Sequence, residues 1–275
     1  MNSLPITRVR PPSAWNGIDV REMWEHRDLL EALIRRDLTV RYKQTIAGVL
    51  WVLGQPILTT VTLSLLLVRL VGQSPKGTPL PLFVYVGMVP WAYFTHALTK
   101  SSTCFVEHAG LVTRVYLPRL LIPMASILAA LVDFGLAFLI LPILMAIYGV
   151  APSLTLAALP LILVLMIVST FGIGLWLASL DAEFRDISFA MPFLLQLGLF
   201  VTPIFYSSEI VPFPLRWLYA LNPMAGVVEG MRWSLLNAGP PPLEVMTISI
   251  IGTLVILTSG LYVFQRREPN LADVI

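Results

Sequence analysis

The residues that could support catalysis or metal binding are few and scattered in this chain. Its three histidines, His26, His96 and His108, lie far apart, and no His-Glu-x-x-His pattern places two of them on one helix face around zinc. The single cysteine, Cys104, has no second thiol, which excludes an internal disulfide. A Gly-x-Ser-x-Gly nucleophile motif is also missing. The sequence therefore predicts no metal site and no catalytic group of residues.

The sequence also lacks a nucleotide-binding loop. Such a loop needs Gly-Lys followed by Ser or Thr, and the chain has only three lysines, Lys43, Lys76 and Lys100. Only Lys100 precedes a serine, and Thr99 stands where the glycine should be. We expect that this chain is not an enzyme, carries no cofactor and cannot hydrolyse ATP by itself.

Composition indicates that lipid is the solvent of this protein. Apolar residues make up 57% and charged residues only 12% of the 275 residues, with a mean hydropathy of +0.81. A soluble domain carries about 25% charged residues, and a disordered chain combines low hydrophobicity with high net charge. The formal charge of +2 is too small to suggest a nucleic-acid partner. A water-soluble globule and a disordered chain are both excluded.

Long apolar runs predict an all-α integral membrane protein with six transmembrane helices. A helix needs about 20 residues to cross roughly 30 Å of hydrocarbon. Proline inside such helices is tolerated, so we expect kinks at Pro56, Pro90, Pro142, Pro160, Pro192 and Pro203. The six runs are 47–71, 82–104, 120–149, 154–179, 187–207 and 244–265.

The sequence also indicates the structure of the N-terminal and C-terminal segments outside the six runs. Residues 1–18 are a flexible arm without the apolar core of a signal peptide. Apolar residues recur at helical spacing over 19–39 with arginines between them, which predicts an amphipathic interface helix over 19–46 that leads into the first span. Residues 47–265 form the six-helix domain, and 266–275 form a cytoplasmic tail.

The distribution of Lys and Arg predicts the orientation. Fourteen of the eighteen lie in the arm and interface helix, the 100–119 and 181–186 connections and the tail, which all fall on one side of the membrane. By the positive-inside rule, both termini are cytoplasmic.

The connection between the fifth and sixth runs does not resemble an ordinary loop. Residues 215–221 and 224–236 are apolar but too short to cross the bilayer, and Asn222-Pro223 separates them. We expect short helices that dip into the outer leaflet or cap a cavity. An aromatic belt and a gate are both open interpretations of the aromatic residues there. Glu229 and Arg232, three residues apart on one predicted helix, could pair.

Asp133 is the clearest carboxylate inside a predicted span. A buried acid in lipid is by default a candidate for function, but ion-coupled carriers usually show several such groups. We favour a structural role for Asp133, hydrogen-bonded between helices or at a partner interface, over a role in ion coupling.

Several short motifs follow one another over residues 20–265. The entry to the first span carries Arg36-Asp37-Leu38-Thr39-Val40-Arg41-Tyr42-Lys43-Gln44-Thr45. It is followed by Gly48, Leu50-Trp51, Gln55-Pro56, Gly87, Pro90-Trp91, Val115-Tyr116-Leu117-Pro118-Arg119, Pro123, Phe184-Arg185-Asp186-Ile187, Thr202-Pro203-Ile204-Phe205-Tyr206 and Leu221-Asn222-Pro223-Met224. In this order, these motifs resemble the permease subunits of ABC-2 type transporters that export polysaccharides such as O-antigen, with capsule and teichoic acid exporters as relatives.

This resemblance implies a homodimer of permeases in the bacterial inner membrane, with two copies of a separate ABC ATPase subunit that binds ATP and Mg²⁺. The connection 100–119 looks like the coupling helix that contacts the ATPase, and the interface helix looks like a second contact. For Arg114 and Arg119 a plain anchoring role at the membrane surface is equally open, and the interface helix could simply be a surface helix. The implied coupling residues are Glu107, His108, Leu111, Arg114, Tyr116, Arg36 and Asp37.

The resemblance also implies a channel between the two permeases and a gate on its outer side. Aromatic rings suit sugar passage because they pack against pyranose C–H faces without demanding one hydrogen-bond pattern, although aromatic residues at helical spacing commonly face lipid or other helices. The implied channel residues are Trp51, Tyr85, Trp91, Tyr93, Phe94, Phe200, Phe205 and Tyr206. The implied gate residues are Trp217, Tyr219, Asn222, Pro223 and Trp233, with Trp217 and Trp233 as the plug.

The function that follows is export of a polysaccharide, lipid-linked in this interpretation, powered by the separate ATPase. An ABC-2 permease that exports a small lipid or drug is the nearest alternative. A membrane scaffold or membrane enzyme without transport is a third.

Overall fold

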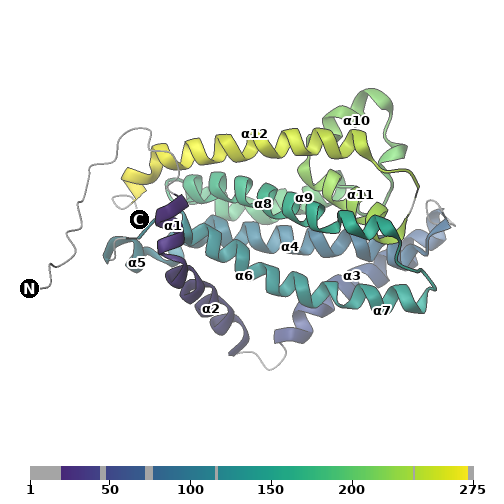
Figure 1. Cartoon of the computed structure of the whole chain (residues 1–275), viewed down its shortest axis with the longest axis horizontal. Coiled ribbons are helices and arrows are strands. Elements are labelled where there is room, and N and C mark those ends of the chain that lie inside the picture. Colours follow the sequence, from purple (N-terminus) through teal and green to yellow (C-terminus); the bar gives the residue numbers. More distant parts are fainter. Residues whose placement is uncertain (1–19, 44–47, 72–76, 115–116, 238, 272–275) are drawn as a thin grey trace, which may run out of the picture.

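The computed structural model describes residues 20–43, 48–71, 77–114, 117–237 and 239–271, which form helices and turns without a strand (Figure 1). The predicted all-α fold class is confirmed for these residues, and the predicted arm, 1–18, lies outside them. The α-helices are α1 (Val20–Glu25), α2 (Arg27–Lys43), α3 (Gly48–Val71), α4 (Leu80–Glu107), α5 (Ala109–Arg114), α6 (Leu121–Phe138), α7 (Ile140–Ile147), α8 (Leu159–Asp181), α9 (Asp186–Val201), α10 (Phe213–Ala220), α11 (Pro223–Leu236) and α12 (Leu243–Arg267). Short 3₁₀ turns are η2 (Leu154–Ala158), η3 (Ser208–Ile210) and η4 (Glu268–Asn270).

The long helices lie side by side along the longest axis of the molecule (Figure 1). Helices α1 and α5 and the C-terminal end of α12 lie at one end, and α10 and α11 lie at the other. Residues predicted to couple to an ATPase and residues predicted to form a gate are therefore at opposite ends of one bundle.

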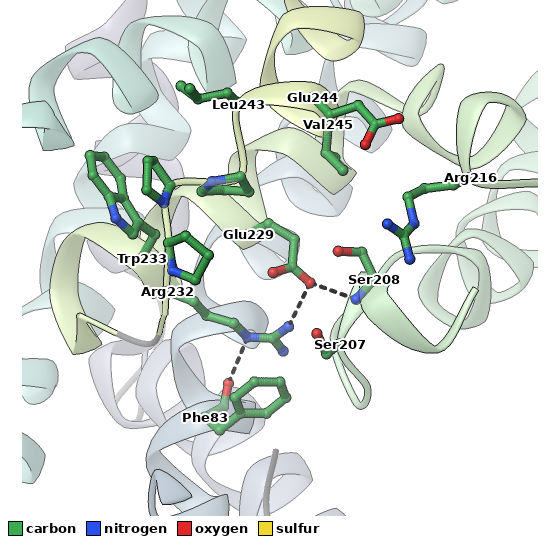
Figure 2. A pocket seen from close by; sticks show the side chains of 13 residues that line it. Phe83, Ser207, Ser208, Arg216, Glu229, Arg232, Trp233, Leu243, Glu244 and Val245 are labelled. Atoms are coloured by element: carbon green, nitrogen blue, oxygen red, sulfur yellow. Dashed lines mark hydrogen bonds and ion pairs between the residues drawn. The ribbon is translucent and has the colours of Figure 1, made fainter. Parts of the chain in front are cut away.

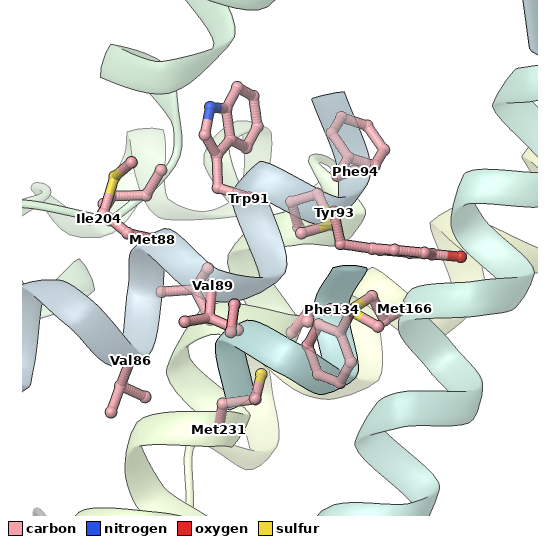
Figure 3. Close-up of a cluster of buried hydrophobic side chains, with 14 of the residues drawn as sticks. Val86, Met88, Val89, Trp91, Tyr93, Phe94, Phe134, Met166, Ile204 and Met231 are labelled. Atoms are coloured by element: carbon pink, nitrogen blue, oxygen red, sulfur yellow. The ribbon is translucent and has the colours of Figure 1, made fainter. Parts of the chain in front are cut away.

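Helix α4 is the centre of this bundle and is buried along most of its length. It packs against α3, α6, α8 and α11. Figure 3 shows Val86 and Tyr93 of α4 in one cluster with Phe134 of α6, Met166 of α8 and Met231 of α11. The rings of Tyr93 and Phe134 meet edge to face with centroids 5.8 Å apart. Neighbouring helices therefore surround α4 along most of its length.

Glycine allows α8 and α12 to pack with their backbones in contact. A Cβ atom at Gly260 would lie 2.5 Å from the Gly172 carbonyl oxygen, and one at Gly172 would lie 2.9 Å from the Leu257 backbone. Next to this contact, the Trp176 indole N–H donates to Ser259 Oγ over 3.0 Å. Helices in lipid associate through such close packing because lipid supplies no hydrophobic driving force between them.

Four helical stretches of the described residues are long and apolar enough to cross a membrane: Leu50–Leu67, Leu121–Ile147, Leu154–Asp181 and Leu243–Arg267. The predicted runs 82–104 and 187–207 are not among them. Helix α4, which contains the first of these runs, has 28 residues but a polar C-terminal part. Helix α9, in the second, is an apolar helix of 16 residues and spans about 24 Å at 1.5 Å per residue. The number of six spans stays a prediction.

Proline accounts for the break between α6 and α7. The ring of Pro142 clashes with the carbonyl four residues earlier, and α6 ends at that residue, Phe138. At Pro56, Pro90 and Pro192, in contrast, the helix continues through the proline. Pro160 lies in the first turn of α8, where its missing N–H has no cost, and Pro203 follows the end of α9.

The predicted interface helix is divided in two. Helix α1 ends at Glu25, and α2 begins after His26, whose Nδ1 lies 2.8 Å from the Glu22 carbonyl oxygen. Helix α2 packs against α6 and buries Leu33, so this segment belongs to the bundle as well as to its surface. Residues 44–46 of the predicted segment lie outside the described residues.

Candidate functional site

Two predicted coupling residues, Asp37 and His108, meet at the end of the bundle that carries α1 and α5. Asp37 Oδ1 of α2 lies 3.7 Å from Nε2 of His108, the C-cap residue that follows α4. The other ring nitrogen, Nδ1, lies 2.8 Å from the Cys104 carbonyl oxygen. The contact with the Asp37 carboxylate raises the pKa of the buried His108 above its ordinary value, although burial and the nearby Arg36 act in the opposite direction.

The other predicted coupling residues are spread over this end. Glu107 accepts from Lys100 Nζ over 3.2 Å and from Thr103 Oγ1 over 2.7 Å, so it is tied to its own helix. Residues 100–107 continue α4, and the predicted coupling segment 100–119 is thus the end of α4 followed by α5. Leu111 of α5 is half-buried and Arg36 of α2 is exposed. The Arg114 side chain and Tyr116 lie outside the described residues.

Asp133 of α6 is at the centre of a buried group of polar side chains from α2, α4 and α6. The Tyr42 hydroxyl donates to Oδ1, and the Arg41 guanidinium forms an ion pair with Oδ2. His96 of α4 lies with Nε2 3.6 Å from Oδ2 and also contacts Arg41. The expected hydrogen-bonded position of Asp133 between helices is therefore present. A buried carboxylate next to a guanidinium and a hydroxyl avoids the cost of an unpaired charge.

Arg232 of α11, at the opposite end of the bundle, is a buried charged side chain with several polar partners. Only 2% of its surface is exposed. Its Nε, Nη1 and Nη2 atoms donate to the carbonyl oxygens of Phe83, Tyr206 and Ile204 over 3.3, 3.1 and 2.6 Å. Its Cζ lies 3.5 Å from the centroid of the Phe83 ring. The predicted pair with Glu229 is confirmed, with 3.6 Å between Nη1 and Oε1 (Figure 2).

Two further residues complete this contact. Glu229 Oε1 accepts from the Ser208 backbone N–H over 2.9 Å, and a Cβ at Gly87 would lie only 3.1 Å from Arg232 Nη2. The set fixes α11 to the first turns of α4 and to the segment after α9. Sequence reasoning found the pair but missed these partners. The available signal was an arginine inside an apolar segment, where an unpaired charge is costly.

Asn222 explains why the connection divides into two helices. Its side-chain oxygen accepts from the Met224 N–H over 3.1 Å and so caps α11, and Pro223 occupies the first turn. Its side-chain NH₂ donates to Thr202 Oγ1 over 2.9 Å. The break between the two short helices lies at Asn222-Pro223, where the sequence predicts it, and their re-entrant position and gating role stay predictions.

The aromatic residues predicted for the gate do not form one cluster. The Tyr219 ring lies 6.3 Å from the Tyr206 ring. Trp217 of α10 is 55% exposed, whereas Trp233 of α11 is half-buried and lines a pocket beside Glu229. A gate that involves these residues stays a prediction.

The predicted channel residues fall into two groups. Tyr85, Trp91, Tyr93 and Phe94 are buried inside the single chain, and a Cβ at Gly198 of α9 would lie 2.8 Å from the Trp91 ring. The others reach the surface of the chain. Trp51 is 71% and Phe200 61% exposed, and Phe205 and Tyr206 are half-buried.

Helix α9 has a largely uncovered apolar face. Phe189, Phe193 and Phe200 are 82%, 63% and 61% exposed, and their spacing puts them on one side of the helix. Met191 is the buried residue of this helix. An apolar face of this kind requires lipid or another protein chain as its environment.

Comparison with known proteins gives a match over most of the chain. The ABC-2 type transporter family matches residues 28–236. The chain is 30% identical over 256 residues to O-antigen export system permease protein RfbA of Klebsiella pneumoniae, which covers 90% of this chain and 95% of that protein. It is 27% identical over 258 residues to the protein of the same name from Myxococcus xanthus, with 93% and 98% covered. Polysialic acid transport protein KpsM of Escherichia coli is 24% identical over 260 residues, with 94% and 98% covered.

Proposed function

Because the chain belongs to the ABC-2 type transporter family, we propose that it is the permease subunit of a transporter that exports a polysaccharide such as O-antigen across the inner membrane. The similarity to O-antigen export permeases over 90% of the chain carries this proposal. The chain is a multi-pass membrane protein of a family whose permease subunits are not themselves catalytic. In our proposal the polysaccharide is linked to a lipid.

An ABC ATPase supplies the energy in this proposal. Two copies of a separate ATPase subunit bind ATP and Mg²⁺ and dock at the end that carries α1 and α5. The contact of Asp37 with His108 supports this assignment because it joins α2 to the end of α4. A force on either helix would then reach both, and the long α4 would carry it to the opposite end of the bundle.

The proposed topology has six spans, with both termini in the cytoplasm. Helices α3, α4, α6–α7, α8, α9 and α12 cross the membrane. Helix α4 has 28 residues, more than the roughly 20 that a span needs, and its polar C-terminal part would lie at the cytoplasmic surface. The concentration of Lys and Arg on one side supports the orientation, which puts α10 and α11 on the outer side.

Two permeases form the channel in this proposal. The uncovered faces of α9 and α3, with Phe200 and Trp51, would meet their counterparts across a symmetric interface. Trp51, Phe200, Phe205 and Tyr206 are the best candidates for the channel wall, because they already lie at the surface of one chain. Tyr85, Trp91, Tyr93 and Phe94 would have to leave the core to reach a sugar.

Movement at the outer end would open and close this channel. ATP can favour the open state only if it binds that state more tightly. Helices α10 and α11 with Trp217, Tyr219, Asn222, Pro223 and Trp233 form the gate in our proposal. Because Arg232 fixes α11 to α4, we expect α11 to move with α4 and α10 to move separately.

Expression of the chain together with an ABC ATPase subunit from its host tests the proposed function. We expect the two proteins to co-purify, and we expect a host that lacks this chain to lose its surface polysaccharide while the lipid-linked polymer accumulates inside. A host that keeps normal surface polysaccharide without this chain, or a chain that drives uptake on an ion gradient alone, would contradict the proposal.

A further inference from the structure

A cavity of about 290 Å³ lies at the end of the bundle that carries α10 and α11 (Figure 2). Its wall is built from Phe83 of α4, Ser207 and Ser208 after α9, α10, α11 and the first turn of α12. The site thus combines Phe83 with residues between Ser207 and Val245 of the same chain. We propose that this pocket binds one sugar unit of the exported saccharide, a use that rests on the proposed function.

Glu229 supplies the central hydrogen-bond acceptor of the pocket. This residue is 8% exposed, and its Oε1 atom already interacts with the Ser208 N–H and with Arg232. A carboxylate has two oxygens that together can accept several hydrogen bonds. Glu229 can therefore accept a hydrogen bond from a ligand hydroxyl in addition to these two contacts.

The charges of the pocket favour a neutral polyhydroxyl ligand. Two carboxylates, Glu229 and Glu244, face two guanidiniums, Arg232 and Arg216, so the wall carries no net charge. Arg232 donates from each of its three nitrogens to backbone carbonyls, which leaves it poorly placed to grip a phosphate with two parallel hydrogen bonds. An anion or a metal cation would meet as much repulsion as attraction.

The remaining wall offers the apolar contact that a pyranose ring uses. Trp233 lies on the side of the pocket opposite Arg216 and Glu244 (Figure 2). The run Pro240–Pro242 also lines the pocket. Aromatic and proline rings can pack on the C–H face of a sugar while its hydroxyls reach the polar side. The volume of about 290 Å³ lies at the lower limit of ordinary ligand pockets, which suits a single ring.

Binding can be measured on the full chain in lipid nanodiscs by saturation-transfer NMR. The probes are an equimolar mixture of the methyl glycosides of mannose, galactose, rhamnose and N-acetylglucosamine, and binding of inorganic phosphate is measured separately from the width of its phosphorus-31 resonance. We expect transfer to at least one glycoside, a fall of at least tenfold in Glu229→Gln and in Trp233→Leu, and no broadening of the phosphate resonance. Glu25→Gln, an exposed change on α1 at the far end, should behave like the wild type.

Because Glu229→Gln leaves a buried arginine with a weaker partner and could fail to fold, Glu244→Gln is the second variant. Glu244 is exposed at the start of α12, and its loss should weaken transfer at least threefold in a folded protein. Equal transfer in the wild type and in folded Glu244→Gln and Trp233→Leu, or phosphate binding in place of the glycosides, would overturn the inference.

Surface polysaccharide in cells separates this inference from the proposed function. Normal export by the wild type together with no glycoside binding would remove the sugar site and leave the permease function intact. Glycoside binding by a chain whose loss does not affect surface polysaccharide would contradict the permease function instead.

Discussion

Asp37 of α2 lies 3.7 Å from His108 at the end of α4, and this contact joins the surface helix to the central helix of the bundle. The two residues come from the two segments that the ABC-2 resemblance assigns to ATPase contact. The pair is partly shielded from solvent, because the His108 side chain is 5% exposed and the Asp37 side chain 26% exposed. Its strength therefore depends on the charge of His108.

The stability of this contact should depend on pH. His108 has a pKa raised above 6.5 in the folded chain, mainly by its contact with the Asp37 carboxylate. A group with a raised folded-state pKa contributes stability that is complete below the unfolded pKa, near 6.5, and is lost as the pH rises through the folded pKa. We expect the wild type to unfold at a higher temperature than Asp37→Asn at pH 6, and the difference to shrink at pH 9.

Asp28→Asn on the same helix is the control, since Asp28 is 92% exposed and contacts only Arg27, over 3.7 Å, among the described residues. Its unfolding temperature should stay close to that of the wild type at both pH values. A constant difference between wild type and Asp37→Asn from pH 6 to pH 9 would exclude the charged form of His108 from this contact.

Arg232 should be required for the stability of the outer end. Arg232→Gln would leave Glu229 as a buried charge without a counterion and three carbonyls without their donor, at a cost of about 3–5 kcal/mol. Arg232→Lys keeps the charge but loses the planar fork, so it should also destabilise, although less. Thermal unfolding in detergent measures both. Arg185→Gln, at an exposed position, should change stability by less than about 0.5 kcal/mol, and equal effects at the two arginines would contradict the assignment.

Local chemistry made several of these elements predictable. Asn222-Pro223 combines a good N-cap with a proline suited to the first turn, so the division into α10 and α11 could be read from the sequence. Pro142 likewise marks the break between α6 and α7. The ion pair between Glu229 and Arg232 was predictable because residues three apart on a helix lie on the same face.

Long-range contacts were not predictable in the same way. Nothing near Asp133 in the sequence indicates that Arg41 and Tyr42 reach it from another helix. The partners of Arg232 are mostly backbone carbonyls, which have no sequence signature. Buried Tyr85 and exposed Phe200 are both aromatic residues in apolar helices, so residue type could not separate a core side chain from one at the surface.

Close packing of α8 on α12 should tolerate no added carbon at Gly260. Because a Cβ there would lie 2.5 Å from the Gly172 carbonyl oxygen, Gly260→Ala should separate the helices and cost about 1–3 kcal/mol. Gly135→Ala in α6 is a matched control, since a Cβ there meets no atom within 4 Å among the described residues. Alanine is the better helix former by about 1 kcal/mol, so Gly135→Ala should be neutral or stabilising. Thermal unfolding measures the stability of both variants. Equal unfolding midpoints for the two would contradict direct contact between the backbones of α8 and α12.

Substitutions in the two groups of aromatic residues should affect different properties: exposed residues should affect export, and buried residues should affect stability. Trp51→Ala and Phe200→Ala change side chains that are 71% and 61% exposed, so we expect a near-normal unfolding temperature and at least a threefold loss of surface polysaccharide per folded permease. Trp91→Ala removes a buried ring that packs on Gly198 and should cost about 3–5 kcal/mol of stability, with export falling in proportion to the amount of folded protein.

Leu161→Ala on α8 is the control for the loss of an exposed apolar side chain, since Leu161 is 64% exposed, and it should leave export and unfolding temperature unchanged. Unchanged export by both Trp51→Ala and Phe200→Ala, with the protein folded, would remove these two residues from the channel wall. Exposure on the uncovered faces of α3 and α9 would then reflect contact with lipid alone.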